Sequence, residues 1–387
     1  MIKKNLTLLT LIHSFQRFAT NSLGFFWAIY FTQIGLSGTQ SGILFMTLTV
    51  TGVLITLPGG LLNDRIPSKR IIQLGLILMI IEFLTLSQTQ YFPFILAMFF
   101  IGGIGTNLYN ISMDSLFYKT SQGEPPSKRI KTYVGFYLLG AGIGVLFSGN
   151  ILEYIDFQKY LIVTAGLVSI LLILSLLLPS TETFKFEIES YKKDIKKPHV
   201  LLFIAIIFSF AIHMGSEFTS YGPFLKETLG LTFSQMGAYM GTAIICMFAT
   251  VRLTNRALEK GTGIKTIITL GLLCSGIGYL IMLIPIIPIS LVGRIIHEGG
   301  DAMMFVFLYT GVLEFFKKER IGGNSGLITL TQTSAIALSS LVFGPLGSSF
   351  GNQIPIIIGA ITTLLAIILL KEYEHISEKH SNNGNAR

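Results

Sequence analysis

The sequence predicts an all-α membrane protein with twelve transmembrane helices in two pseudo-symmetric six-helix bundles, both termini being cytoplasmic. The first observation behind this is composition, since only 12% of the 387 residues are charged and 51% are hydrophobic. A soluble domain carries about 25% charged residues. The second is a recurrence of apolar runs about 20 residues long, enough for a helix to cross the hydrocarbon core. The third is that basic residues gather in every second connection between these runs.

Twelve apolar runs define the expected spans, with approximate ends. They are residues 7–34, 40–62, 70–90, 93–118, 132–152, 158–178, 200–225, 233–253, 265–284, 286–315, 321–347 and 352–371. The first run resembles a signal peptide, but His13 and Arg17 interrupt its apolar core and no small-residue cleavage site follows. We therefore interpret it as the first span.

The basic residues predict the orientation. If the N-terminus is cytoplasmic, all but four of the 28 Lys and Arg residues lie in cytoplasmic segments. The exceptions are Lys159 and Lys226 on the opposite side, and Arg17 and Arg294 within spans. This is the positive-inside pattern. The net charge of +8 thus reflects topology, and we expect a lipid bilayer rather than nucleic acid as the partner.

The chain also repeats itself at an offset of 191 residues. Arg129, Ile130 and Gly135 recur as Arg320, Ile321 and Gly326, and Asp64–Arg65 recurs as Asn255–Arg256. We expect a six-helix bundle at 1–179, a cytoplasmic linker at 180–199, a second bundle at 200–372 and a disordered tail at 373–387. Duplicated six-span halves with a substrate site between them are a transporter architecture.

Residues 60–70, GLLNDRIPSKR, carry a resemblance to a known family. They resemble the loop between the second and third helices of the major facilitator superfamily, whose pattern is Gly-x-Leu-x-Asp-Arg-x-Gly-Arg-Lys. Gly60, Leu62, Asp64, Arg65 and Lys69 match, whereas Pro67 and Ser68 replace the usual Gly and Arg. The resemblance covers the whole chain. It implies a monomeric transporter of the cell membrane that works by alternating access, with neither enzymatic activity nor a cofactor.

The same loop predicts a conformational gate, because an acid followed by bases can cap a helix and pair across the two halves. In the family, the Arg often pairs with an acid at the cytoplasmic end of the fourth helix. That place holds Lys119 here, with Asp114 more than a turn earlier, so the relay is either rewired through Asp114 or missing. Alternatively, the bases only anchor the topology. The gate candidates are Gly60, Asp64, Arg65, Lys69, Asp114 and Arg129.

Ionisable residues inside the spans are the candidate transport site. Arg294, His297, Glu298 and Asp301 share one helix face. Charges buried in a bilayer are costly and indicate function.

The resemblance implies that helices 1, 4, 7 and 10 line a central cavity, and the repeat places Glu298 over Asn107 and Asp301 over Asn110. The substrate-binding candidates are Arg17, Asn21, Asn107, Asn110, His213, Arg294 and His297, and the proton-coupling candidates are Glu217, Asp301 and Glu298. His13 is expected to be an ordinary interfacial residue.

Other interpretations of this region remain open. Arg294 and Glu298 are also spaced for a purely structural salt bridge. The segment HEGGD is one residue away from the zinc-peptidase signature, but Asp301 replaces the second His, so we predict no resident metal. Metal as cargo stays an alternative, because His and carboxylates bind transition metals.

The direction of transport is predicted from the two acids. Glu217 and Asp301 occupy places resembling the proton-carrying acids of the drug:proton antiporter branch, and a proton carrier must change its protonation as its surroundings change. We therefore expect proton-coupled export of small organic molecules. The alternative is proton-coupled import of an anionic metabolite, a siderophore-like compound or a metal, because the guanidinium groups of Arg17 and Arg294 suit an anion.

Overall fold

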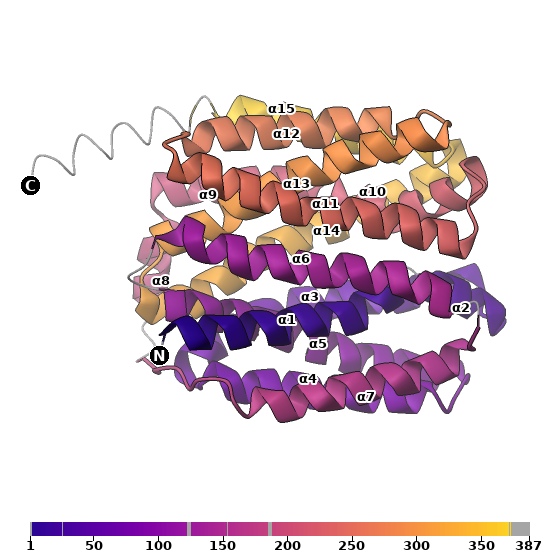
Figure 1. The fold of residues 1–387 in the computed structure, drawn as a ribbon, viewed down its shortest axis with the longest axis horizontal. Coiled ribbons are helices and arrows are strands. Elements are labelled where there is room, and N and C mark those ends of the chain that lie inside the picture. Colours follow the sequence, from indigo (N-terminus) through magenta and orange to yellow (C-terminus); the bar gives the residue numbers. More distant parts are fainter. Residues whose placement is uncertain are drawn as a thin grey trace, which may run out of the picture.

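The computed structural model describes residues 2–24, 26–121, 125–152, 154–184, 188–370 and 372, and within them every regular element is a helix (Figure 1). The predicted tail, 373–387, lies outside the described residues. The helices of the first half are α1 (Ile2–Gly24), α2 (Trp27–Gln33), α3 (Gly38–Arg65), α4 (Ser68–Leu86), α5 (Phe92–Ser121), α6 (Pro126–Ile151) and α7 (Phe157–Ser175). Those that follow are α8 (Ile188–Ile195), α9 (Pro198–Ala211), α10 (Met214–Ser216), α11 (Phe233–Glu259), α12 (Ile264–Ile281), α13 (Ile287–Phe315), α14 (Ile321–Phe350) and α15 (Gln353–Leu365).

The prediction of an all-helical, multi-pass membrane protein is confirmed. In the described part of the chain, eight helices are long and apolar enough to cross a membrane. The helix α13 is also long enough to cross a membrane, with 29 residues. It is not among the eight, and it carries Arg294, Glu298 and Asp301. The number twelve stays a prediction. The expected first span, 7–34, is divided into α1 and α2 near Gly24, a residue type that weakens helix interiors.

Figure 1 shows the helices before residue 180 together in the lower part of the view and those after residue 200 in the upper part. Between these groups, α3 packs against α14 and α6 packs against α11. The α6–α11 contact needs Gly142, since a Cβ there would lie 2.8 Å from Cγ1 of Ile245 and 2.9 Å from its backbone nitrogen. Small residues of this kind let helices approach closely in membranes.

Two helix starts repeat the same local chemistry. Gly35 and Gly230 have φ angles of 78° and 65°, a region that favours glycine. Two residues later each chain segment begins a helix with a capping box, in which side chain and backbone bond reciprocally. The boxes are Ser37–Gln40 before α3 and Thr232–Gln235 before α11. This likeness adds a third motif to the two found in the sequence, here at a slightly larger separation along the chain.

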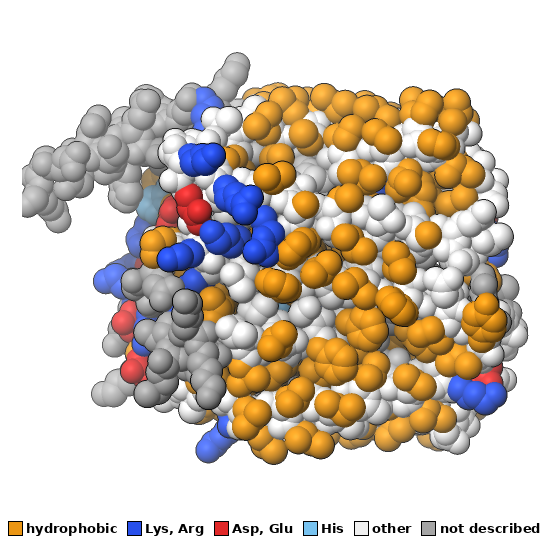
Figure 2. All heavy atoms as spheres, in the orientation of Figure 1, with side chains coloured by type: hydrophobic (Ala, Val, Ile, Leu, Met, Phe, Trp, Pro, Cys, Tyr) orange, Lys and Arg blue, Asp and Glu red, His pale blue; other side chains and the backbone are white. Residues whose placement is uncertain are grey.

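The surface divides into an apolar middle and a charged end (Figure 2). Hydrophobic side chains cover the middle of the visible face, whereas Lys and Arg gather at the end where α8 and the N-terminus lie. Many exposed residues on the long helices are large and apolar, among them Ile173, Leu253 and Leu341. Such a belt is suited to contact with lipid tails.

Candidate functional site

A network of ionisable side chains lies between α13 and the helix that continues α9. The guanidinium of Arg294 donates from Nη2 to Glu298 and from Nη1 to Glu217. The arginine side chain is 3% exposed and its guanidinium lies 4.3 Å from the centre of the Tyr221 ring. The spaced pair Arg294–Glu298 is therefore present. Glu217, for which no certain countercharge was apparent from the sequence, contacts the same arginine.

An irregular stretch of helix carries Glu217. Two π-helical segments, Glu217–Tyr221 and Phe224–Thr228, flank Pro223. Proline has no N–H to donate, so regular α-helical bonding is interrupted around it. π-helical turns are frequent at functional sites. Glu217 thus begins the first irregular turn, four residues after His213, and both side chains reach α13.

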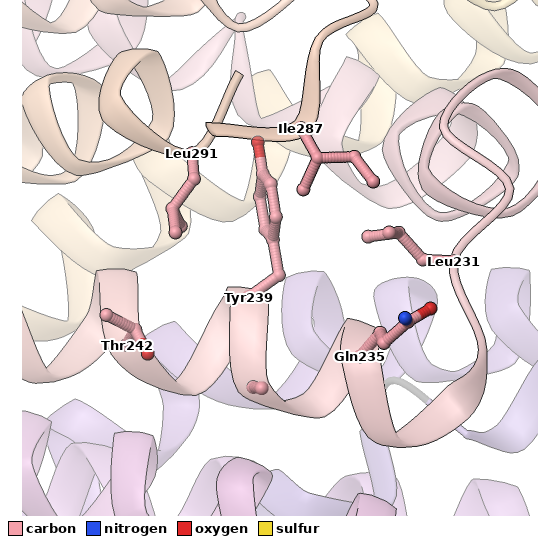
Figure 3. A pocket seen from close by; sticks show the side chains of 7 residues that line it. Leu231, Gln235, Tyr239, Thr242, Ile287 and Leu291 are labelled. Carbon is pink, nitrogen blue, oxygen red and sulfur yellow. The ribbon is translucent and has the colours of Figure 1, made fainter. Parts of the chain in front are cut away.

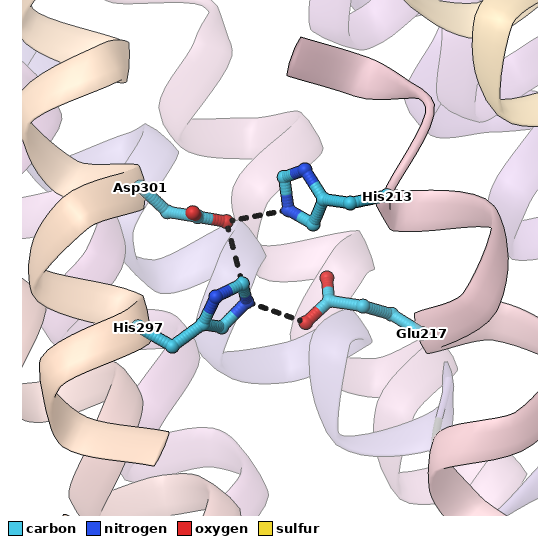
Figure 4. Close-up of side chains that lie close together, drawn as sticks. All are labelled: His213, Glu217, His297 and Asp301. Carbon is cyan, nitrogen blue, oxygen red and sulfur yellow. Dashed lines mark hydrogen bonds and ion pairs between the residues drawn. The ribbon is translucent and has the colours of Figure 1, made fainter. Parts of the chain in front are cut away.

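Two histidines and two carboxylates converge beside this arginine (Figure 4). Nε2 of His213 lies 3.3 Å from Oδ2 of Asp301, and Nε2 of His297 lies 3.2 Å from Oε1 of Glu217 and 3.8 Å from Oδ2 of Asp301. One ligating atom from each of the four residues lies within 4.8 Å of the others. A group with this composition and spacing has the donors that a transition metal takes.

The other ring nitrogens of both histidines point to backbone. Nδ1 of His297 lies 2.8 Å from the carbonyl oxygen of Ser275 on α12, and 3.2 Å from its hydroxyl. Nδ1 of His213 contacts the carbonyl oxygen of Phe210. Tyr279 stacks on the His297 ring with centroids 4.4 Å apart. These contacts fix both ring orientations.

A second polar cluster, formed largely by tyrosines, lies around Asp114. The Asp114 carboxylate accepts a hydrogen bond of 3.0 Å from Tyr133 on α6 and one of 2.8 Å from Tyr309 on α13. His13 is fully buried and stacks on Tyr133 with centroids 5.1 Å apart. The expectation that His13 is interfacial was therefore wrong, because its ring completes an aromatic stack. Tyr309 is eight residues beyond Asp301, about 12 Å along α13.

The remaining substrate-binding candidates are spread over the first half. The guanidinium of Arg17 lies 5.4 Å from the centre of the Tyr137 ring, and its buried Nε has no hydrogen-bond partner in the described part of the chain. The same is true of Oδ1 of Asn110. Asn107 donates to the carbonyl of Gly103 on its own helix at 2.7 Å, and Asn21 is partly buried on α1. The Tyr137 ring lies 5.1 Å from that of His13, so Arg17 joins the tyrosine cluster through Tyr137.

The predicted gate residue Asp64 holds the start of α14. Its carboxylate accepts the backbone N–H of Gly322 at 3.1 Å and that of Gly323 at 2.7 Å. Tyr191 on α8 donates its hydroxyl to the same carboxylate at 3.0 Å, and Nζ of Lys119 lies 3.4 Å away. A carboxylate at a helix N-terminus accepts free N–H groups and matches the helix dipole. The acid of α3 thus bridges α5, α8 and α14.

Among the other gate candidates, Gly60 lies at the contact between the two groups of helices, whereas Lys69 and Arg129 make contacts within the first group. Gly60 permits the α3–α14 approach, because a Cβ there would lie 2.6 Å from the carbonyl oxygen of Gly322. Lys69 donates to the carbonyl of Leu176 at the end of α7, Arg129 donates to that of Thr120, and Arg65 is exposed at the end of α3. Asp64 forms its ion pair with Lys119. Asp114 takes no part in this contact, because its carboxylate accepts hydrogen bonds from Tyr133 and Tyr309.

The connecting helix α8 adds a second carboxylate to this end. Asp194 accepts hydrogen bonds from Nε of Arg320 at 2.8 Å, Nζ of Lys197 at 3.0 Å and Nδ2 of Asn324 at 3.2 Å. Burial raises the pKa of Asp194, but the bonds from Arg320 and Lys197 outweigh it and the pKa lies below its ordinary value. Asp64 and Asp194 together fasten α14 to α3 and α8.

A pocket of about 240 Å³ opens between the first turns of α11 and α13 (Figure 3). It is mostly apolar, and Tyr239 stands at its centre in this view. The Tyr239 hydroxyl lies 2.8 Å from that of Ser290, and its ring centroid lies 6.4 Å from that of Tyr221, the residue under Arg294. A chain of aromatic contacts therefore joins the pocket to the network around Arg294.

The tyrosines are the functional residues that the sequence analysis missed. Tyr133, Tyr309, Tyr221 and Tyr279 all contact a candidate residue, yet no tyrosine was selected from the sequence. A signal existed, because a tyrosine inside a span needs a partner for its hydroxyl.

The chain is similar to known proteins in sequence and in fold. The sequence model of the Major Facilitator Superfamily matches residues 6–339. The crystal structure of the human organic anion transporter MFSD10 (TETRAN) is similar with a TM-score of 0.76 at 14% identity, covering 95% of this chain and 99% of that one. A POT family transporter in complex with 5-aminolevulinic acid is similar with a TM-score of 0.75 at 13% identity, covering 96% of each chain. At these identities the likeness shows the fold. A search of curated proteins found no match.

Proposed function

Because the chain belongs to the Major Facilitator Superfamily and is a transporter rather than an enzyme, we propose that it exports small organic molecules in exchange for protons by alternating access. The observation that carries this proposal is an excess of buried carboxylates. Glu217 and Glu298 contact a single arginine, Arg294, whereas Asp301 lies beside His213 and His297.

The charge count explains why protons are the proposed coupling ion. One guanidinium offsets one of the three carboxylates, and unpaired buried charges are expensive in a membrane. Protons on the carboxylates or on His213 and His297 remove the remaining imbalance. The site therefore gains or loses protons as it is exposed to one side of the membrane or the other. Glu217, Glu298 and Asp301 are the proposed carriers.

The same excess of carboxylates over arginine favours exchange of substrate for protons over transport of both in one direction. A substrate that is cationic or donates hydrogen bonds offsets the same carboxylates as the protons do. Substrate and proton then compete for one site, which is the requirement for antiport. The apolar pocket near Tyr239 is suited to the non-polar part of such a molecule.

The rest of the proposed architecture follows the sequence. We propose twelve spans divided into bundles at 1–179 and 200–372, with the basic end shown in Figure 2 in the cytoplasm. Residues 180–199, which include α8, form the cytoplasmic linker. The protein is proposed to act as a monomer in the cell membrane, with α3–α14 and α6–α11 as the contacts that change between states.

Everted membrane vesicles test the proposal. A small panel of organic compounds is offered under an imposed pH gradient, acid inside, and accumulation is compared with vesicles lacking the protein. Accumulation that collapses when nigericin dissipates the gradient supports proton-coupled export. Accumulation that is unchanged by nigericin, for every transported compound, contradicts it.

Import of an anionic solute is the second candidate, and Arg17 favours it. The Arg17 side chain forms no direct ion pair in the part of the chain that the structure describes, and its guanidinium faces Tyr137. A guanidinium without a directly bonded carboxylate is suited to a carboxylate or phosphate of a substrate. The similar human protein is named as an organic anion transporter, which is consistent with this candidate. Proton-driven uptake of organic acids into right-side-out vesicles distinguishes it from export.

A further inference from the structure

His213 and His297 each lie between a backbone carbonyl oxygen and a carboxylate oxygen, both of which are hydrogen-bond acceptors. The carbonyl oxygens of Ser275 and Phe210 only accept hydrogen bonds, so Nδ1 of His297 and Nδ1 of His213 must carry the hydrogens. In a neutral imidazole ring, Nε2 then carries a lone pair and no hydrogen, so it can only accept. Both Nε2 atoms point at carboxylate oxygens, which are acceptors too. A positive species between them is needed to make these contacts favourable.

The second sign of a missing cation is an orphaned oxygen. Oδ1 of Asp301 is buried and has no hydrogen-bond partner in the described ranges, although the residue is only 3% exposed. Buried carboxylate oxygens without partners are costly. Its other oxygen, Oδ2, already lies near both histidines. Asp301 thus turns one oxygen toward both imidazole nitrogens and keeps a second, unpartnered oxygen on the same carboxylate.

The arrangement around the ligating atoms has the features of a metal centre. Histidines that bind metals donate their other ring N–H to a carbonyl or carboxylate, which fixes the tautomer. Both histidines do so here, and Tyr279 holds the His297 ring by stacking. Figure 4 shows the four side chains converging from α13 and from the segment around α10. Their ligating atoms lie within 4.8 Å of one another.

We propose that His213, Glu217, His297 and Asp301 bind one divalent transition-metal ion, for which Zn²⁺ and Co²⁺ are suitable probes. Two imidazole nitrogens with two carboxylate oxygens form a four-coordinate set that these ions accept. Mg²⁺ and Ca²⁺ prefer oxygen ligands throughout and fit less well. The charge balances, because a divalent ion and Arg294 together offset Glu217, Glu298 and Asp301.

This site uses residues proposed to carry protons, but its existence does not depend on transport or on its direction. It differs from the sequence analysis, which predicted no resident metal. The sequence showed only half of the ligands in one segment, since His297 and Asp301 lie on α13 while His213 and Glu217 come from a helix some 80 residues earlier. Folding brings the two pairs together.

Metal titration of the purified full-length protein tests the proposal. The protein, stripped with a chelator and freed of any affinity tag, is titrated with Co²⁺, and the visible absorption bands of four-coordinate Co²⁺ are recorded. We expect one ion per chain and displacement by Zn²⁺. The variants His213→Gln, His297→Gln and Asp301→Asn should each weaken binding at least about tenfold. Thermal unfolding of each variant shows whether it is folded.

The controls use three histidines outside the proposed site. His199→Gln, on α9, and the double variant His375→Gln/His380→Gln should bind Co²⁺ as the unaltered protein does. Absence of four-coordinate bands, or bands that persist in the three site variants, overturns the proposal. Loss of binding in the tail variant overturns it as well. If pH-driven export fails in vesicles while Co²⁺ binding is retained, the proposed function is wrong and the metal site stands.

Discussion

The carboxylate of Asp64 accepts the backbone N–H of Gly323 at 2.7 Å, so the end of α3 caps the first turn of α14. These residues are 259 positions apart in the chain and belong to different predicted bundles. The contact is buried, since Asp64 is 2% exposed, and it lies against Tyr191 of α8. Because this cap comes from a residue of a different helix, it links α3 to α14 and is a means of holding a transporter closed at that end.

Asp64→Asn is expected to slow transport strongly while leaving membrane insertion intact. The amide retains one acceptor oxygen but loses the charge that attracts Lys119 and the start of α14. Charge-assisted hydrogen bonds contribute about 1.5–3 kcal/mol, so the closed state should lose roughly ten- to a hundredfold in population. Initial rates in vesicles, normalised to the protein in the membrane, measure the effect.

The matched control for this change is Asp156→Asn. Asp156 accepts the backbone N–H of Lys159 at 2.7 Å, so it caps the single helix α7. This control should transport at the unaltered rate. If well-inserted Asp64→Asn transports equally fast, the cap at α14 does not hold a state of the cycle.

Arg294→Lys tests whether the arginine holds the network together. Arg294 contacts Glu217 and Glu298 through different nitrogens and lies over Tyr221. A lysine ammonium lacks the planar fork and cannot reproduce both contacts. Breaking a buried pair costs about 3–5 kcal/mol, so Arg294→Ala should lower the thermal unfolding temperature in detergent most and Arg294→Lys less.

Two comparisons separate this structural role from substrate binding. Arg294→Ala combined with Glu298→Gln should recover part of the lost stability, because one unpaired carboxylate is removed. Arg17→Ala, which breaks no ion pair among the described residues, should change stability little. A stable Arg294→Ala protein with weakened substrate binding would instead assign Arg294 to the substrate.

Asp194 is expected to make stability depend on pH. Its pKa is lower folded than unfolded, so it stabilises the protein fully above the unfolded value of about 4 and loses this contribution as the pH falls through the folded value. Asp194→Asn should therefore unfold at a lower temperature than the unaltered protein at neutral pH, and the gap should close in acid. Glu189→Gln, an exposed neighbour paired with Lys192 on α8, should show no such gap. A gap independent of pH would contradict the assignment.

The fold was largely predictable because its signals are local. Apolar runs and the loop at 60–70 fixed most helices within a few residues, and the repeat pointed to Asp64 and to the start of α14. The division of the first span near Gly24 was not predicted, since no breaker as strong as proline occurs there.

The candidate site was less predictable because its contacts are not local. The spacing of Arg294 and Glu298 predicted their pairing, but the contact with Glu217 depends on how a π-helical segment is placed against α13. The role of Lys119 was also missed. The family pattern expects an acid at its position, whereas here the lysine supplies the positive charge and Asp64 the negative one.

The last prediction concerns the proton carriers. Asp301→Asn and Glu217→Gln fix each side chain in a form that resembles the protonated carboxyl group. Substrate binding should persist, because shape and hydrogen-bonding capacity change little. Transport driven by a pH gradient should fail in the variant that removes the carrier, since the carboxyl group can no longer release a proton.

The exchange assay distinguishes loss of coupling from loss of transport. Exchange of labelled for unlabelled substrate across vesicles does not require the carrier to release its proton, so it should survive in the variant that has lost pH-driven transport. Glu298 shares Arg294 with Glu217 and is able to take over part of the proton load, so each single variant is also combined with Glu298→Gln. Asp156→Asn, on the exposed start of α7, serves as the neutralised control. Undiminished pH-driven transport in all of these variants would show that the protons follow another route through the protein, or that none are coupled.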